Sequence, residues 1–243
     1  MMDDIGEIEN AENVMLSGVI GRISGLDSEG KGQAIVNEAY EKQSGFKIAV
    51  KRYSVDDASE EAIKLIRHEI VMMRQLRHDS VIHCLGSFAL PNHMEIWLLT
   101  PFMSVGSLRT VLDNHFPDGI PESAISPIVR DVLFGLHHLH ERGIVHRAIK
   151  VNLEDKKKRF NKLISCIHFQ SSHILIDDHG RAKLSGLRYS CSLYDTAVEA
   201  SCSASVGGIR QDRYDYPLYL SLKNINWMSP EILQQVCNRY FHL

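Results

Sequence analysis

The chain has 243 residues, of which 44% are hydrophobic and 23% are charged, and its formal net charge is −3. This length and composition fit a globular protein of one or two domains with a buried core. The small negative charge gives no reason to expect nucleic acid or an anionic membrane as a partner. No apolar run reaches about 18 residues, so we expect no membrane-spanning helix.

The cysteines and the first residues bear on the compartment. The five cysteines are odd in number and none belongs to a CxxC pair, which argues against a disulfide framework or a zinc site. The opening sequence MMDDIGEIEN is acidic and lacks the apolar segment typical of a secretory signal. These features favour a reducing compartment, the cytoplasm or the nucleus.

The first part of the chain predicts a small sheet with one helix. Short apolar stretches at 14–21, 33–40 and 46–53 are separated by turns rich in glycine and serine, which indicates three strands. Residues 54–78 predict a helix, with Ser54 or Asp56 as its cap. Its apolar residues recur three and four positions apart, at Ile63, Ile66, Ile70 and Met73.

Two more strands, 81–90 and 94–103, are predicted around a turn at Pro91-Asn92. Helices are predicted at 107–116 and 121–143, and a hairpin over 174–186. Strands around one helix, followed mainly by helices, indicate an α+β fold with a β-rich first lobe and a helical second lobe. The apolar face of the longer helix consists of Ile128, Val132, Leu136 and Leu139.

The spacing of a lysine and a glutamate in the first half of the chain indicates a candidate site. Lys51 lies in IAVK at a strand end, and Glu69 follows eighteen residues later on the predicted helix. Either alone is commonly a solvated surface charge, but with the hinge-like LLTPFMSVGSL they match the order of a protein kinase. There, such a lysine binds the nucleotide's α- and β-phosphates and pairs with the glutamate. Thr100 then takes the gatekeeper position, and the hinge that would meet the adenine edge consists of Pro101, Phe102 and Met103.

The glycine-rich loop that covers the phosphates in a kinase is poorly matched. After Gly21, Ile23 stands where the second glycine of the motif is expected, and the spacing beyond Gly25 is irregular. Without those glycines the backbone approaches phosphates less easily. The sequence leaves open whether this segment covers a nucleotide or forms a plain β-turn.

The acids needed for catalysis are absent. A kinase uses an aspartate to orient the substrate hydroxyl, and an asparagine with a second aspartate to hold Mg²⁺. Here Ala148, His173 and Gly186 take these three positions. Alanine and glycine offer no side-chain oxygen, and imidazole is a poor ligand for a hard cation. We therefore expect no phosphoryl transfer and no bound metal.

Several motifs resemble those of the STRAD pseudokinases, the Ste-twenty-related adaptors. The resemblance extends from about residue 14 to residue 235. It is specific in the combination of HRAIK, SHILI and LSGLR, because these substitutions occur together in that family and not in active kinases. Further matching stretches are TPFMSVGSL, HFPDGIPESAI, YDYPLYLS and NWMSPEILQQ.

The resemblance implies a bilobal protein-kinase-like fold and an inactive adaptor in the cytoplasm and nucleus. Family members hold a master serine/threonine kinase of the AMP-activated-kinase pathway active, together with a helical-repeat scaffold protein. Some members bind ATP without turnover. Lys51, which some members lack, would support nucleotide binding. Lys150 and Arg188 would supply positive charge near the phosphates in place of Mg²⁺.

Residues 151–170 interrupt the predicted catalytic loop. Without these twenty residues, four residues separate Ala148 from His173, which is the spacing of the kinase loop. The EDKKKRF stretch also fits a basic nuclear-localisation patch or a solvated surface insertion. We favour a retained intron or a gene-model error, because the segment keeps the frame and is rich in Lys, Asn, Phe and Ile. The same hypothesis applies to residues 236–243.

The sequence thus predicts four regions. They are a disordered N-terminus at 1–13, a kinase-like N-lobe and hinge at 14–103, a partial C-lobe at 104–235 with the insertion 151–170, and an aberrant tail at 236–243. An incomplete helical C-lobe would expose apolar surface and destabilise the fold. Two alternatives to an adaptor stay open here: an active serine/threonine kinase of the Ste-twenty-like group, and a truncated inert isoform.

Overall fold

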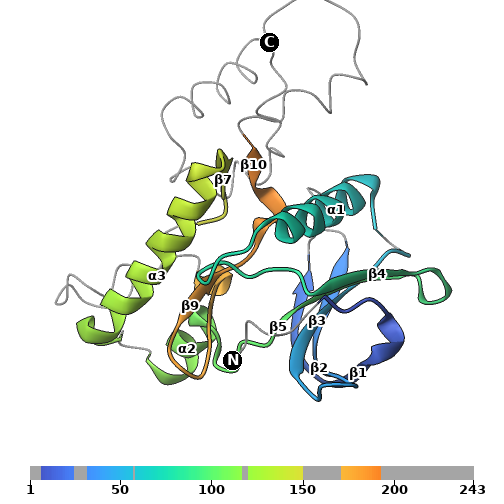
Figure 1. The fold of residues 1–243 in the computed structure, drawn as a ribbon, viewed down its shortest axis with the longest axis horizontal. Coiled ribbons are helices and arrows are strands. Elements are labelled where there is room, and N and C mark those ends of the chain that lie inside the picture. The colour runs from blue at the N-terminus through green and yellow to red at the C-terminus, as the bar shows by residue number, and fades with distance from the viewer. Residues whose placement is uncertain (1–6, 25–31, 57, 117–119, 150–170, 193–243) are drawn as a thin grey trace, which may run out of the picture.

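A computed structural model describes residues 7–24, 32–56, 58–116, 120–149 and 171–192 of the chain. These residues form a β-rich lobe, seen at the right of Figure 1, and a second part that contains the long helix α3 at the left. This is the bilobal α+β arrangement that the sequence predicts. The predicted insertion 151–170 and tail 236–243 lie outside the described residues.

The sheet of the first lobe is antiparallel throughout. Its five strands follow the order β1-β2-β3-β5-β4, and all the strands predicted for this lobe are present. The fourth strand begins at Gly86 instead of near residue 81, because Val81 and Ile82 bond to the second lobe. The strand bounds are Val14–Ser24 for β1, Gln33–Glu41 for β2, Lys47–Ser54 for β3, Gly86–Leu90 for β4 and Glu95–Pro101 for β5.

Helix α1 (Glu60–Gln75) carries the apolar face that the sequence predicts, while its predicted cap is wrong. The helix begins after Ser59, whose hydroxyl accepts a hydrogen bond from an amide of the first turn. Neither Ser54 nor Asp56 caps it, because strand β3 runs on to Ser54 and a longer connection follows. The buried members of the predicted face are Ile66 and Met73.

One apolar core runs through both lobes. It joins side chains of α1, β5, α3 and β9, among them Ile66, Leu98, Val132, Leu139 and Leu184. A second, smaller core lies on the other face of the sheet and includes Ile48, Val50 and Leu99. Because side chains alternate between the faces of a strand, neighbouring residues of β5 serve different cores. The first core is the one that positions the site described below.

The N-terminal prediction needs correction from residue 7 onward. The Ile8 side chain is 6% exposed, and its amide donates a hydrogen bond to the Leu85 carbonyl oxygen at 2.7 Å. Glu7 pairs with Arg74 of α1 at 2.9 Å. Residues 7–13 therefore pack against the first lobe and are not disordered. The few apolar residues in this acidic stretch follow no helix or strand period, so the sequence gave no signal from which to predict this.

The second part contains the two predicted helices, α2 (Leu108–His115) and α3 (Glu122–Glu141). None of the helices in the described ranges is long and apolar enough to cross a membrane. Short strands surround them: β6 (Gly106–Ser107), β8 (Ile174–Ile176) and β9 (Ala182–Leu184) form one sheet, and β7 (Ile144–Val145) pairs with β10 (Cys191–Ser192). The 3-10 helices are η1 (Ala11–Asn13), η2 (Pro91–His93), η3 (Ser171–His173) and η4 (Leu187–Tyr189).

Backbone hydrogen bonds join the two lobes directly. The Ile82 amide donates to the Leu184 carbonyl oxygen at 2.8 Å, and the Leu184 amide donates to that of Ser80 at 2.8 Å. Gly135 of α3 lies against this junction. A Cβ atom built there would stand 2.7 Å from the Ser80 carbonyl oxygen and 2.9 Å from Leu184 Cδ1. The missing side chain at Gly135 thus lets α3 approach both segments closely.

The substitution Gly135→Ala tests this close approach. Alanine normally favours a helix over glycine by about 1 kcal/mol. Here the overlap is with backbone, so we expect a net loss of about 1–3 kcal/mol in the free energy of unfolding. Chemical denaturation of the full chain measures it. The exposed Ser126→Ala on the same helix is the control and should stay within about 0.5 kcal/mol of wild type. Wild-type stability in Gly135→Ala would contradict the packing.

Candidate functional site: a buried charge cluster between the lobes

Strand β3 presents Lys51 and Tyr53 to helix α1. Side chains two positions apart in a strand lie on the same face. Tyr53 is fully buried in the core that α1 lines, and Lys51 Nζ lies 5.2 Å from the centroid of the Tyr53 ring. Ile48 and Val50 belong to the core on the opposite face. The alternation of β3 therefore directs the lysine toward the helix that carries Glu69.

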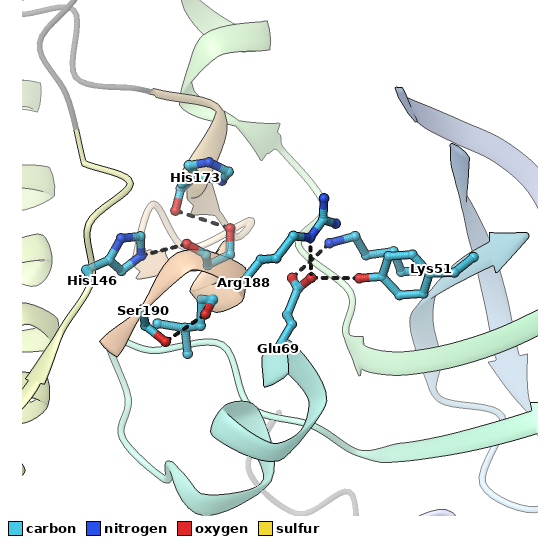
Figure 2. Close-up of polar contacts among 9 residues, drawn as sticks. Lys51, Glu69, His146, His173, Arg188 and Ser190 are labelled. Atoms are coloured by element: carbon cyan, nitrogen blue, oxygen red, sulfur yellow. Dashed lines mark hydrogen bonds and ion pairs between the residues drawn. The ribbon is translucent and has the colours of Figure 1, made fainter. Parts of the chain in front are cut away.

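Three side chains hold the carboxylate of Glu69 (Figure 2). Oε1 pairs with Lys51 Nζ at 2.8 Å, and Oε2 lies 3.3 Å from Arg188 Nε. The Tyr53 hydroxyl donates a hydrogen bond to Oε2 at 2.8 Å. The Glu69 side chain is only 3% exposed. A buried carboxylate is tolerated when it is paired and hydrogen-bonded, and these contacts meet both conditions.

The charges of the cluster fix its protonation. Burial alone would raise the pKa of Glu69, but the charges of Lys51 and Arg188 outweigh it and lower the pKa to about 2. Burial and the neighbouring carboxylate raise the pKa of Tyr53 well above its ordinary value. Burial lowers the pKa of Lys51, against the attraction of Glu69. Glu69 is therefore ionised and Tyr53 neutral at physiological pH.

The cluster holds more positive than negative charge. Lys51 and Arg188 contribute two cations, and Glu69 contributes one anion. The side chains of the two cations are 18% and 9% exposed, so solvent screens them little. Positive charge held in low-dielectric surroundings attracts anions. The arrangement is suited to a phosphate group.

A second contact ties α1 to the residues that follow the LSGLR motif. His68 Nε2 lies 2.8 Å from the Ser190 carbonyl oxygen, so this nitrogen carries the proton and donates it. The Ser190 hydroxyl donates to the Leu187 carbonyl oxygen at 2.7 Å (Figure 2). Leu187 is fully buried in the common core. Helix α1 and η4 are therefore joined by both polar and apolar contacts.

The two halves of the interrupted catalytic loop meet in this structure. His146 Nδ1 accepts a hydrogen bond from the Ala148 amide at 3.3 Å, so Nε2 carries the proton. Nε2 donates it to the Ser185 carbonyl oxygen at 2.9 Å (Figure 2). The Ser185 amide in turn donates to the His173 carbonyl oxygen at 2.8 Å. Ser185 thus links the stretch before residues 151–170 to the stretch after it.

The three degenerate positions offer few ligands to a metal ion. Ala148 is 2% exposed and presents only a methyl group, and Gly186 presents no side chain. Burial, with His146 and Lys51 nearby, lowers the pKa of His173 to about 3, so its imidazole is neutral. No group of three His, Cys, Asp or Glu side chains in the described part of the chain is placed to hold a metal ion. The set is a poor match for Mg²⁺, which prefers oxygen ligands.

The predicted hinge lies at the end of β5, beside β3. Thr100 is paired in the ladder with Ala49, which stands two positions before Lys51 on β3. The Phe102 ring centroid lies 4.6 Å from Lys47 Nζ. Met103 is 7% exposed and belongs to the common core. The hinge residues are thus placed next to the strand that carries the lysine.

Other predicted site residues lie partly outside the described ranges. Gly21 and Ile23 are part of β1, whereas Gly25 is not described. A phosphate-covering loop therefore stays a prediction. Lys150 also lies outside the described residues, so its role near phosphates stays a prediction too.

Three residues of the site were not predicted. Tyr53 carries a usable signal, because it stands two positions after Lys51 in a strand and must share its face. His146 is the first residue of the HRAIK motif, but nothing in the sequence showed which carbonyl it bonds. The partner of His68 is Ser190, 122 positions away, so no local spacing indicates the contact.

Comparisons with known proteins agree with this geometry. The protein kinase domain profile matches residues 28–193. The chain belongs to the protein kinase domain family.

The predicted resemblance to the STRAD family is confirmed by relatives. The STE20-related kinase adapter protein alpha of Homo sapiens is 31% identical over 205 residues, which cover 84% of this chain and 40% of that protein. The alpha protein of Gallus gallus is 30% identical, over 85% of this chain and 44% of its own length. The beta protein of Homo sapiens is 27% identical, over 84% and 41%. The chain spans less than half the length of these relatives.

The pKa of Glu69 predicts how stability changes in acid. The pKa of this carboxyl is ordinarily 4.5 and falls to about 2 in the folded chain. The ionised carboxylate therefore stabilises the fold fully at a pH above 4.5. That contribution, about 3 kcal/mol, is lost as the pH falls from about 5 to about 2. Denaturation at pH 5, 4 and 3 should show the loss in wild type and a smaller loss in Glu69→Gln. The exposed Glu60→Gln on the same helix should follow wild type. Equal pH slopes for wild type and Glu69→Gln would rule the cluster out.

Proposed function

We propose that the chain is a catalytically inactive, protein-kinase-like adaptor that binds a partner serine/threonine kinase and activates it allosterically. One observation carries the proposal. The Lys51–Glu69 ion pair is formed at 2.8 Å, while Ala148 and Gly186 lack the oxygens that catalysis needs. In kinases this ion pair belongs to the active arrangement. The chain therefore combines an active shape with an inactive site.

The inactivity follows from what each position has lost. Without an acceptor at Ala148, the substrate hydroxyl is not oriented and its proton has no base to receive it, an effect worth about 10²- to 10⁴-fold in rate. Without oxygens at Gly186, and with imidazole at His173, Mg²⁺ is not held against the phosphates. These effects fall on one reaction, so they reinforce one another.

The adaptor role is supported by how α1 is held. The described residues themselves fix the helix, through Arg188 on Glu69 and through Ser190 on His68. A surface that is already ordered loses little conformational entropy when a partner binds. Contacts within the chain hold α1 in an active-like position without a catalytic cycle. The chain is therefore suited to presenting an ordered surface to a partner.

We further propose that the charge cluster between the lobes binds the phosphates of ATP without a divalent metal. Lys51 and Arg188 carry one positive charge in excess of Glu69. That excess of positive charge suits the phosphates. The resemblance to the STRAD family implies that Lys150 adds a third cation. The hinge residues Thr100 to Met103 lie beside β3, where an adenine edge would meet backbone groups.

For the partner, we propose a master serine/threonine kinase of the AMP-activated-kinase pathway, acting with a helical-repeat scaffold protein in the cytoplasm and nucleus. The support is the resemblance to the STRAD family, together with relatives whose names describe kinase adapters. The charge cluster is compatible with this role but does not select the partner.

A reconstituted phosphorylation assay tests the function. The chain alone, the partner kinase alone and the mixture are given radiolabelled ATP with Mg²⁺ or Mn²⁺ and a peptide substrate. We expect no phosphate transfer by the chain alone and an increase in partner activity on the order of tenfold in the mixture. Glu69→Lys, which places a third cation in the cluster, should abolish the increase. The exposed Glu60→Lys is the matched control and should not.

Two outcomes would overturn the proposal. Phosphate transfer by the chain alone that Lys51→Ala abolishes would show an active kinase. A partner whose activity stays unchanged in the mixture, with binding shown by co-purification, would exclude activation.

Nucleotide binding makes a separate prediction. Titration with a fluorescent ATP analogue should give the same affinity in EDTA and in Mg²⁺, because Ala148, His173 and Gly186 supply no side-chain oxygen for the metal. Replacing both Lys51 and Arg188 by alanine should weaken binding at least about tenfold, since two charge-assisted contacts are lost. Arg109→Ala, an exposed charge change on α2, should bind as wild type does. Unchanged affinity in the double variant would disprove this phosphate site.

A further inference from the structure

His173 fills the space beside Gly186. A Cβ atom built on Gly186 would stand 2.7 Å from both Cγ and Cε1 of the His173 ring, and would touch Nδ1 as well. Real Cβ atoms essentially never approach other atoms within 3.0 Å. Rotation of the ring about the Cβ–Cγ bond of His173 does not relieve the overlap, because Cγ lies on that axis and does not move. The whole imidazole would have to leave its position.

The backbones of the two residues are also held close together, so they cannot simply move apart to relieve the overlap. The amide and the hydroxyl of Ser185 both donate to the His173 carbonyl oxygen, at 2.8 and 3.2 Å (Figure 2). The next pair, Ile174 and Leu184, is matched in the β8–β9 ladder. Leu184 also bonds to the first lobe through Ser80. Separating Gly186 from His173 would therefore disturb the ladder and the junction between the lobes.

We propose that His173 and Gly186 are an obligate pair, in which the imidazole excludes every side chain at position 186. The proposal deepens the metal-free site proposed above and rests on it for its functional meaning. Positions 173 and 186 take the places of the metal-binding asparagine and aspartate of a kinase. If the pair is obligate, the residue at one of these positions limits the residue at the other. A carboxylate at 186 fits only when a smaller residue stands at 173. His173 acts as a positioning residue, because its ring occupies the volume that a side chain at position 186 would need.

A double-mutant cycle tests the pairing without any ligand. Gly186→Ala is compared in the wild-type chain and in His173→Ala by thermal unfolding of the full chain. We expect Gly186→Ala to lower the melting temperature by about 4 °C more in wild type than in His173→Ala, since the overlap exists only when the imidazole is present. If Gly186→Ala alone does not fold, recovery of folding in the double variant supports the pair.

Backbone strain needs its own control. Gly186 has a φ of 80°, which alanine tolerates poorly in any surroundings. Gly180 has a φ of 75° and nothing within 4 Å of a Cβ built on it. Gly180→Ala therefore measures the strain alone, and it should show the same loss in both backgrounds. Equal losses for Gly186→Ala in both backgrounds would overturn the proposal.

Nucleotide binding measured with and without Mn²⁺ distinguishes the proposed pairing from an effect of His173 on stability alone. Binding of a fluorescent ATP analogue is measured with and without Mn²⁺ in Gly186→Asp and in the pair His173→Asn with Gly186→Asp. Only the pair should gain metal-dependent binding, by about tenfold or more. The same gain in Gly186→Asp alone would overturn the proposal. A wild-type chain that binds no nucleotide contradicts the proposed nucleotide site, while the thermal cycle still decides the pairing.

Discussion

The buried carboxylate of Glu69 is the group on which the arrangement between the lobes depends. It collects contacts from β3 through Lys51 and Tyr53, and from η4 through Arg188. Left without them, an ionised group at this depth would be strongly unfavourable. The position of α1, the inward direction of Arg188 and the burial of Tyr53 are therefore mutually dependent, and a change at one of them is felt by the others.

Much of the fold and the Lys51–Glu69 ion pair could be predicted from the sequence, for a definite reason. Lys51, Glu69, Ala148 and Gly186 occupy motif positions, and spacing along the chain is enough to identify motif positions. The cap at Ser59 was missed because several polar residues precede α1, and only the backbone geometry decides among them. Contacts such as that of His68 depend on how distant segments pack, which spacing does not encode.

The site also shows how catalytic acids can be lost without loss of shape. The core through both lobes includes Leu187, so apolar burial helps to hold the segment after Gly186. His146 secures the Ser185 carbonyl oxygen from the other side. These anchors use neither the side chain at 148 nor the side chain at 186, so the frame does not depend on the acids that a kinase carries at those two positions.

The segment around Ile8 has a consequence for self-association. Strand β4 is an edge of the five-stranded sheet, and unpaired main-chain groups at an edge are a template for a strand of another molecule. The Ile8 amide occupies the Leu85 carbonyl oxygen immediately before this strand. The short segment around Ile8 thus covers a main-chain acceptor next to the edge strand and also adds a buried side chain to the smaller core.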